Sequence, residues 1–230
     1  RNPIWWQTTV ASAGNLTSAV YRIFGKPFSE EGKKLFGVPF AQFLKLNSEF
    51  RYHYRIDKNQ MIASRIAGGV IWSYGNATTA PYTEQFYIGG ANSVRAFSAR
   101  SIGPGGYPPE TDRKYTYINH VGDIRIEANI EYRFRMIADL HGAVFLDAGN
   151  VWLMRKDENR PNGEFTLKNF PKQIALGTGF GLRYDLDFLV FRLDLGIGLH
   201  DPYDTGKSGY YNIPKFKDSM ALHFAIGYPF

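Results

Sequence analysis

The stretch that decides the fold is the fourth predicted strand, which reads Gly122-Asp123-Ile124-Arg125-Ile126-Glu127-Ala128-Asn129-Ile130-Glu131-Tyr132-Arg133-Phe134-Arg135-Met136. Charged or amide side chains occupy every odd position from Asp123 to Arg135, and apolar or aromatic side chains occupy the even positions. Successive side chains of a β-strand point to opposite faces of its sheet. The stretch therefore predicts a strand with one charged face and one apolar face.

The same kind of pattern, together with turn residues between the segments, predicts about eight strands along the chain. One short segment, Leu16–Phe24, has a helical period instead. The predicted fold class is all-β. The predicted strands are Ile4–Asn15, Pro39–Ile56, Met61–Tyr74, Gly122–Met136, Leu140–Leu153, Gln173–Asp185, Phe188–His200 and Asp218–Phe230.

The lengths of the connections favour a membrane barrel over a soluble one. Alternation alone fits both, because a soluble barrel turns its apolar face inward. The connections at 57–60, 137–139 and 186–187 are tight, whereas those at 75–120, 154–172 and 201–217 are long. Outer-membrane barrels alternate short periplasmic turns with longer extracellular loops in this way. We therefore predict a transmembrane antiparallel β-barrel in the outer membrane, with its charged faces lining the lumen.

Eight strands are too few to enclose what this barrel would contain. An eight-stranded barrel has an interior just wide enough for its own side chains. Inward arginines and glutamates and a folded-in loop over Gly89–Pro109 could not share that space. The first strand would also expose an edge unless it closed against the last. The sequence therefore predicts the C-terminal half of a larger barrel.

The long connection before the fourth strand carries the candidate site. Arg95 lies between Val94 and Phe97, in a segment with paired glycines and little surface-type charge. Such a segment is typical of a loop tip that packs into the protein. A buried arginine then needs a carboxylate partner, because an unpaired buried charge is costly. Spacing alone leaves a second interpretation open, in which Arg95 is one of many ordinary lumen charges.

Five ordered stretches resemble the BamA/TamA family of outer-membrane assembly barrels, most closely its TamL-like members. The loop Gly89-Gly90-Ala91-Asn92-Ser93-Val94-Arg95-Ala96-Phe97 is similar to the family's Val-Arg-Gly-Phe/Tyr lumen loop, with Ala96 in place of the usual glycine. Phe145-Leu146-Asp147-Ala148-Gly149 is similar to the x-Asp-x-Gly strand motif. The other stretches are Gly122–Phe134, Gly177–Arg183 and the terminal Phe224-Ala225-Ile226-Gly227-Tyr228-Pro229-Phe230.

The resemblance implies a barrel of about sixteen strands preceded by periplasmic POTRA domains, with residues 1–230 forming its last eight strands. It also implies that Arg95 pairs with Asp147, and with Glu131, which strand parity turns inward as well. A lateral seam and a C-terminal recognition signal are expected at the end of the last strand. The candidate residues there are Phe224, Gly227, Tyr228 and Phe230.

The function implied by the resemblance is assembly, insertion or translocation of outer-membrane proteins through this seam. The expected partners are outer-membrane lipids, unfolded outer-membrane protein clients, the N-terminal half of the barrel, the POTRA domains, and accessory lipoproteins or a TamB-like periplasmic protein. A two-partner-type secretion pore is the alternative, because it shares the loop and the x-Asp-x-Gly motif. The clients stay open, as does the choice between protein assembly, surface export and lipid transport.

Signals for catalysis or for nucleotide and nucleic-acid binding are weak. The sequence has neither a Gly-x-Ser-x-Gly nor a His-Glu-x-x-His motif, and Ser219 with His223 shows local spacing only. Gly177, Gly179 and Gly181 could suggest a nucleotide fingerprint, but no helix follows them; they are expected to clear lumen space for the loop. The net charge of +6 is spread over alternating positions. We predict no enzyme activity, cofactor, metal or nucleic-acid partner.

Overall fold

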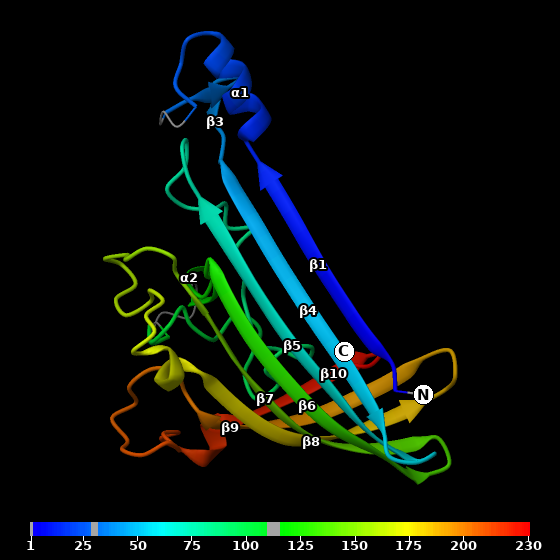
Figure 1. Cartoon of the computed structure of the whole chain (residues 1–230). Coiled ribbons are helices and arrows are strands. Elements are labelled where there is room, and N and C mark those ends of the chain that lie inside the picture. Colours follow the sequence, from blue (N-terminus) through cyan, green and yellow to red (C-terminus); the bar gives the residue numbers. More distant parts are fainter. Residues whose placement is uncertain (1, 29–31, 110–115) are drawn as a thin grey trace.

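The computed structural model describes residues 2–28, 32–109 and 116–230, and its main element is one eight-stranded antiparallel sheet. The strands follow the order β1-β4-β5-β6-β7-β8-β9-β10, so each pairs with its neighbour along the sheet (Figure 1). The eight predicted strands are confirmed. Their bounds are β1 Ile4–Ala13, β4 Phe43–Arg55, β5 Gln60–Ser73, β6 Ile124–Ile137, β7 Leu140–Trp152, β8 Ala175–Asp185, β9 Val190–His200 and β10 Met220–Ile226.

Short elements occupy the long connections. The segment between β1 and β4 holds the helix α1 (Asn15–Ile23), close to the predicted Leu16–Phe24, and a small hairpin of β2 (Lys34–Leu35) and β3 (Val38–Pro39). The later connections hold α2 (Thr116–Asn119) and the 3-10 turns η1 (Phe170–Gln173) and η2 (Phe216–Ser219). Within the described ranges, no helix is long and apolar enough to cross a membrane.

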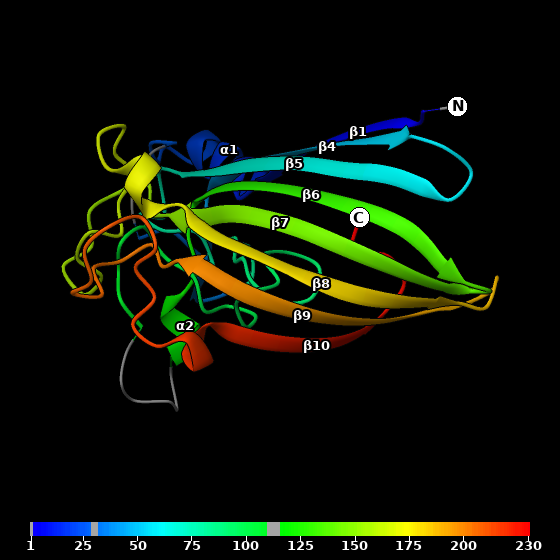
Figure 2. The same ribbon diagram turned by 90° about the horizontal axis from the view of Figure 1, so that it is seen from below.

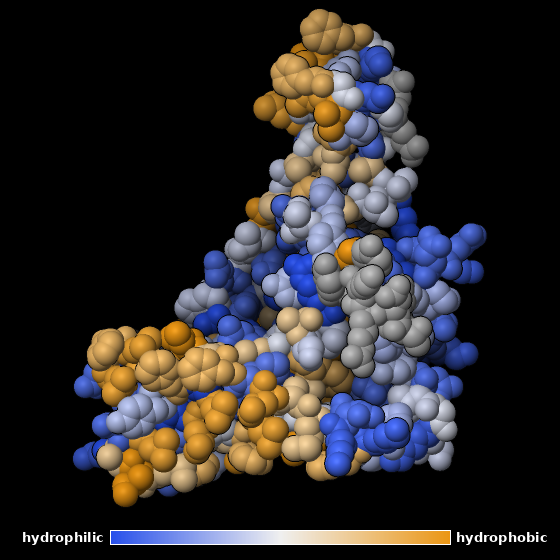
Figure 3. Space-filling view, turned by 180° about the vertical axis from the view of Figure 1, so that it is seen from behind, coloured by the Kyte–Doolittle hydropathy of each residue, from blue (hydrophilic) through white to orange (hydrophobic). Residues whose placement is uncertain are grey.

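The sheet curls into an open trough, with loops of one end folded onto its concave side (Figure 2). Side chains alternate between the two faces as predicted. On β6, Glu127, Glu131 and Arg133 are buried in the trough, while Ile130 is exposed on the outside. Apolar side chains gather over the C-terminal strands on the outer surface (Figure 3). The charged face therefore lines the interior, and the apolar face is the exposed outer one.

Two predicted strand ends are wrong by four residues. Three further end residues that were expected in strands lie in helical elements instead: Asn15 in α1, Gln173 in η1 and Asp218 in η2. The second strand was expected from Pro39, but that residue belongs to the small β2–β3 hairpin and β4 begins at Phe43. The last strand was expected to reach Phe230, but β10 ends at Ile226. Gly227 has φ +83°, a left-handed conformation that no extended strand adopts. The chain turns there, which ends the alternation.

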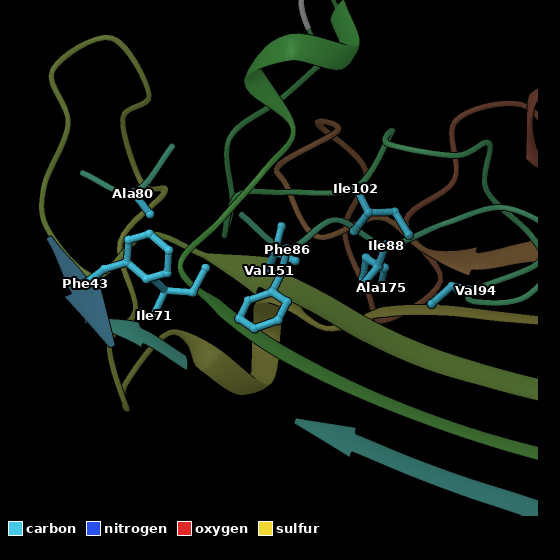
Figure 4. Close-up of a cluster of buried hydrophobic side chains, with 9 residues drawn as sticks. All are labelled: Phe43, Ile71, Ala80, Phe86, Ile88, Val94, Ile102, Val151 and Ala175. Carbon is cyan, nitrogen blue, oxygen red and sulfur yellow. The ribbon is translucent and has the colours of Figure 1, made fainter. Parts of the chain in front are cut away.

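A cluster of buried apolar side chains fastens the long β5–β6 connection to the inner surface of the sheet (Figure 4). Some members come from strands β4, β5, β7 and β8, and the others come from the connection itself. Residues 110–115 of this connection lie outside the described residues. The cluster consists of Phe43, Ile71, Ala80, Phe86, Ile88, Val94, Ile102, Val151 and Ala175. Because apolar burial holds both sides together, the loop has a fixed place inside the trough.

Candidate functional site

The tip of this connection, which we call the lumen loop (residues 85–109), is shaped by its glycines. Gly89 and Gly90 have φ +98° and +91°, in the region where a Cβ is disfavoured. A Cβ on Gly89 would lie 2.2 Å from the carbonyl oxygen of Ser98. The Gly90 amide donates to the carbonyl of Phe97 at 2.8 Å. The two glycines thus let the loop close tightly and present Arg95 at its tip.

Arg95 is completely buried and forms a bidentate ion pair with Asp147 on β7. Its Nε and Nη2 lie 2.8 and 2.9 Å from the two carboxylate oxygens, and its backbone amide donates to the same carboxylate at 3.0 Å. Its Nη1 donates to Glu131 on β6. The guanidinium carbon also lies 3.5 Å from the centre of the Phe145 ring. The structure therefore brings together Arg95, Asp147 and Glu131 as the resemblance implied.

Further charges extend this group across the trough. Arg183 on β8 donates to Glu131 at 3.1 Å and to Asp194 on β9 at 2.5 Å. Arg133 donates to the second oxygen of Glu131 at 2.6 Å. All of these charged groups are buried, and a buried ion without a partner costs several kcal/mol. If the loop moved away, the buried carboxylates of Asp147 and Glu131 would lose Arg95 as an ion-pair partner. The ion pairs therefore hold the loop in place.

Glycines on the inner wall make room for the loop. A Cβ on Gly177 of β8 would lie 2.3 Å from the Ala96 side chain. A Cβ on Gly196 of β9 would lie 2.2 Å from the Arg95 carbonyl oxygen and 2.7 Å from the Ala96 Cα. The loop backbone therefore lies directly on the bare backbone of β8 and β9.

The other glycines of the motifs, Gly149, Gly179 and Gly181, make room for other groups. A Cβ on Gly149 would crowd the β6 backbone at 2.7 Å and the side chain of Ile88 in the lumen loop at 3.3 Å. A Cβ on Gly179 would meet the Phe145 ring, and one on Gly181 would meet the Asp194 carboxylate. Of the three predicted lumen-clearing glycines Gly177, Gly179 and Gly181, Gly177 is thus the one in direct contact with the loop.

Sequence reasoning did not select Asp194, Arg183 or Asn129. Asn129 donates to the Asp147 carboxylate at 2.8 Å and to the Ser93 carbonyl in the loop at 3.0 Å. Strand parity does turn all three inward, but parity gives no reason to choose them among the other inward polar residues. Their roles follow from the pairing of β6 to β9 and the curl of the sheet, which bring these side chains to Asp147, Glu131 and Arg95.

The arrangement holds a loop in place through its ion pairs and hydrogen bonds. Ser219 and His223 do not contact one another through their polar atoms. The Ser219 hydroxyl donates to the Phe216 carbonyl at 2.6 Å, and His223 Nε2 donates to the Arg95 carbonyl at 2.9 Å. Among the residues that the structure describes, no three histidine or carboxylate side chains are grouped to hold a metal ion.

The predicted seam residues do not share one face. Phe224 points outward from β10 and is 68% exposed. Tyr228 follows the turn at Gly227 and donates to Asp185 at 3.3 Å. In the predicted strand Asp218–Phe230, Phe230 has the same parity as the outward Phe224, but it is only 7% exposed and lies under the guanidinium groups of Arg65 and Arg133. The reversal at Gly227 is the physical reason, because it carries the following residues off the strand.

Comparisons with known proteins agree with this architecture. The model of the Omp85 superfamily domain matches residues 34–230. The outer membrane protein assembly factor BamA of Nitratidesulfovibrio vulgaris is 28% identical over 204 residues, which cover 86% of this chain and 22% of that protein. BamA of Neisseria meningitidis serogroup B is 29% identical over 89 residues, or 36% of this chain and 11% of that protein. The chain thus spans less than a quarter of these curated relatives.

A solved structure supports the likeness in fold. The crystal structure of BamA from Haemophilus ducreyi lacking POTRA domains 1–3 matches with a TM-score of 0.55 and 16% sequence identity. The match covers 80% of this chain and 35% of that one. The eight-stranded sheet therefore has the arrangement of part of a larger outer-membrane barrel.

Proposed function

The chain belongs to the Omp85 superfamily and is integral to the outer membrane, and from this premise we propose that it is the C-terminal part of a barrel that assembles or inserts other outer-membrane proteins. The work is done at a lateral seam along β10. The upstream half of the barrel and POTRA domains complete the protein, and accessory lipoproteins or a TamB-like protein serve as partners. The proposed activity consumes no nucleotide and makes no covalent bond.

The observation that carries this proposal is the place of β10 at the end of the sheet. Within the described residues, β10 pairs with β9 on one side, and its outer edge, like that of β1, is where this sheet meets the rest of the barrel. The unpaired N–H and C=O groups of an edge strand are a template for another extended segment. An incoming client strand can therefore be recognised by its backbone alone, whatever its side chains.

The shortness of β10 supports the same proposal. β10 has seven residues, whereas β6 has 14. At roughly 3.4 Å per residue, β10 is about 24 Å long. A strand tilted by about 45° then spans only about 17 Å of the apolar band, which is about 25 Å tall in outer-membrane barrels. Lipid next to β10 must become thinner, which lowers the barrier for a client to enter the bilayer there.

The lumen loop, held by its ion pairs, makes the strands beside β10 rigid. Its ion pairs tie β6, β7, β8 and β9 to one another through Arg95, Glu131 and Asp194. A wall held from inside stays in register while the strand beside it exchanges partners. The predicted role of Arg95 with Asp147 and Glu131 is to brace this wall.

A photo-crosslinking experiment in cells tests the proposal. A crosslinker is placed at Phe224 in the full-length protein, and the matched control carries it at Phe180 on β8. Both side chains point outward and are well exposed, at 68% and 55%, but β8 is paired on both sides. We expect unfolded outer-membrane proteins to be captured at Phe224 and not at Phe180. If Phe224 captures only the barrel's own first strand while a soluble cargo crosslinks inside the lumen, the protein is a secretion pore.

A further inference from the structure

We infer that His223 is a positioning residue that couples the lumen loop to β10, so that the place of the loop sets how readily β10 separates from β9. The inference rests on the seam proposed above, because β10 is the strand that borders it, and it assigns to that strand a regulation from inside the barrel.

The contact that carries this inference is a hydrogen bond across 128 residues of sequence. His223 Nε2 lies 2.9 Å from the carbonyl oxygen of Arg95. A carbonyl oxygen only accepts, so the imidazole must donate through Nε2–H. Both the neutral ring protonated at Nε2 and the imidazolium can do so. The bond therefore does not require one particular charge state of the histidine.

No other described side chain on the inner face of β10 can replace this link. Ala221 and Ala225 are too short and carry no donor. The Ser219 hydroxyl donates within its own turn, to the Phe216 carbonyl at 2.6 Å. His223 is thus the side chain through which the inner face of β10 hydrogen-bonds to the lumen loop.

Arg95 connects this bond to the rest of the wall. Its amide and guanidinium bind the Asp147 carboxylate on β7, while its carbonyl receives the bond from β10. The same carbonyl lies against Gly196 on β9, where an added Cβ would be 2.2 Å away. A single residue therefore touches β7, β9 and β10 through its backbone amide and carbonyl. A shift of the loop that breaks the Asp147 contacts also moves the acceptor of His223.

The energetic consequence is large for so short a strand. β10 has seven residues, so its ladder with β9 is short. A hydrogen bond contributes about 1 kcal/mol net, which corresponds to about a fivefold change in an equilibrium. Loss of the His223 bond should therefore raise the population in which β10 is detached from β9 about fivefold.

Hydrogen exchange in the full-length protein in lipid bilayers measures this population. The amides of Met220–Ile226 are followed in His223→Ala, His223→Gln and the control Ser219→Ala. We expect His223→Ala to exchange about fivefold faster in this segment. His223→Gln should stay near the unmodified rate, because its amide also donates, and Ser219→Ala should be unchanged. Equal rates in all variants, or an equal acceleration in all three, would overturn the coupling.

A double-mutant cycle separates coupling from local packing. Arg95→Ala should accelerate β10 exchange when His223 is present and add little when His223→Ala is already made. Additive effects would mean that the two residues act independently, and the inference would fail. If Arg95→Ala does not fold, Arg95→Lys serves in its place, because lysine retains the positive charge but cannot form the bidentate contact of a guanidinium.

The exchange experiment and the crosslinking experiment can fail separately. Exchange rates that follow this pattern without client capture at Phe224 would retain the coupling and reject protein assembly. Client capture at Phe224 with unchanged exchange in His223→Ala would retain assembly and reject the coupling.

Discussion

Gly196→Ala is the substitution that most directly tests whether the loop rests on the bare backbone of β9. The new Cβ would lie 2.2 Å from the Arg95 carbonyl oxygen, 2.6 Å from its carbon and 2.7 Å from the Ala96 Cα. All three are backbone atoms, so no side-chain rotation relieves the contact. The loop would have to move by roughly 1 Å, since overpacked groups are accommodated only by backbone shifts.

The cost of that movement can be worked from the contacts of Arg95. Overpacking alone costs about 1–3 kcal/mol. A shift of that size also stretches the Arg95–Asp147 contacts, which are now 2.8 to 3.0 Å long, and weakened charge-assisted hydrogen bonds add to the loss. We expect the folded barrel to lose about 2–4 kcal/mol, which lowers its unfolding temperature by roughly 5–15 °C.

Heat-modifiable mobility on gels, which distinguishes folded from unfolded barrels, gives the unfolding temperature of the full-length protein. The matched control is Gly198→Ala, on the same strand and the same face. Its added Cβ would have no neighbour nearer than 3.4 Å, an ordinary contact distance. The control should change stability by less than about 0.5 kcal/mol. Equal unfolding temperatures for the two variants would refute the reasoning.

Three further substitutions test other parts of the account. Arg95→Ala should destabilise the barrel by about 3–5 kcal/mol while leaving export intact, because it leaves buried carboxylates unpaired; unchanged growth and unchanged heat-modifiable mobility would contradict this. Gly227→Ala should cost about 1–2 kcal/mol from its positive φ alone, since nothing lies within 4 Å of the new Cβ; a cysteine at Phe230 should then become more reactive to thiol reagents, and an unaltered rate would argue against the turn. In the β7–β8 connection, hydrogen bonding to Arg160 lowers the pKa of Asp157. The stabilisation is present above the ordinary pKa of an aspartate and is lost as pH falls through the lowered value; protease cleavage of this connection should therefore increase at acidic pH, and Asp157→Asn should remove that dependence.

The strands were predictable because apolar and charged residues alternate along the sequence wherever one face of the sheet is turned to lipid and the other to the charged interior. β6 shows this most clearly, and its predicted and observed ends differ by two residues at the start and one at the finish. The end of β10 was not predictable in the same way. Phe230 keeps the parity of the outer face in the sequence, but the positive φ of Gly227 turns it into the trough.

The candidate site could be predicted from the sequence only in part. The pairing of Arg95 with Asp147 spans 52 residues, and motif resemblance, rather than spacing, singled it out. Asp194 and Arg183 carry inward parity like many other charges. Which inward charged side chains form ion pairs depends on the register between strands and on the curvature of the sheet. The alternation of residues along a single strand predicts neither. The functional role of these residues stays a prediction.

Cysteine scanning tests most directly whether the outer edge of β10 pairs with an incoming client strand. Residues 1–230 contain no cysteine, so a cysteine introduced singly from Met220 to Ile226 meets no other in this part of the barrel. Each variant is combined, in the full-length protein, with a client carrying cysteines along its last strand. Paired strands bring Cα atoms to about 4.5–5.5 Å, within disulfide reach. The account predicts disulfides that shift by one client position for each step along β10. Disulfides absent from β10 but formed at Thr83, which borders the lumen cavity beside the loop, would contradict it.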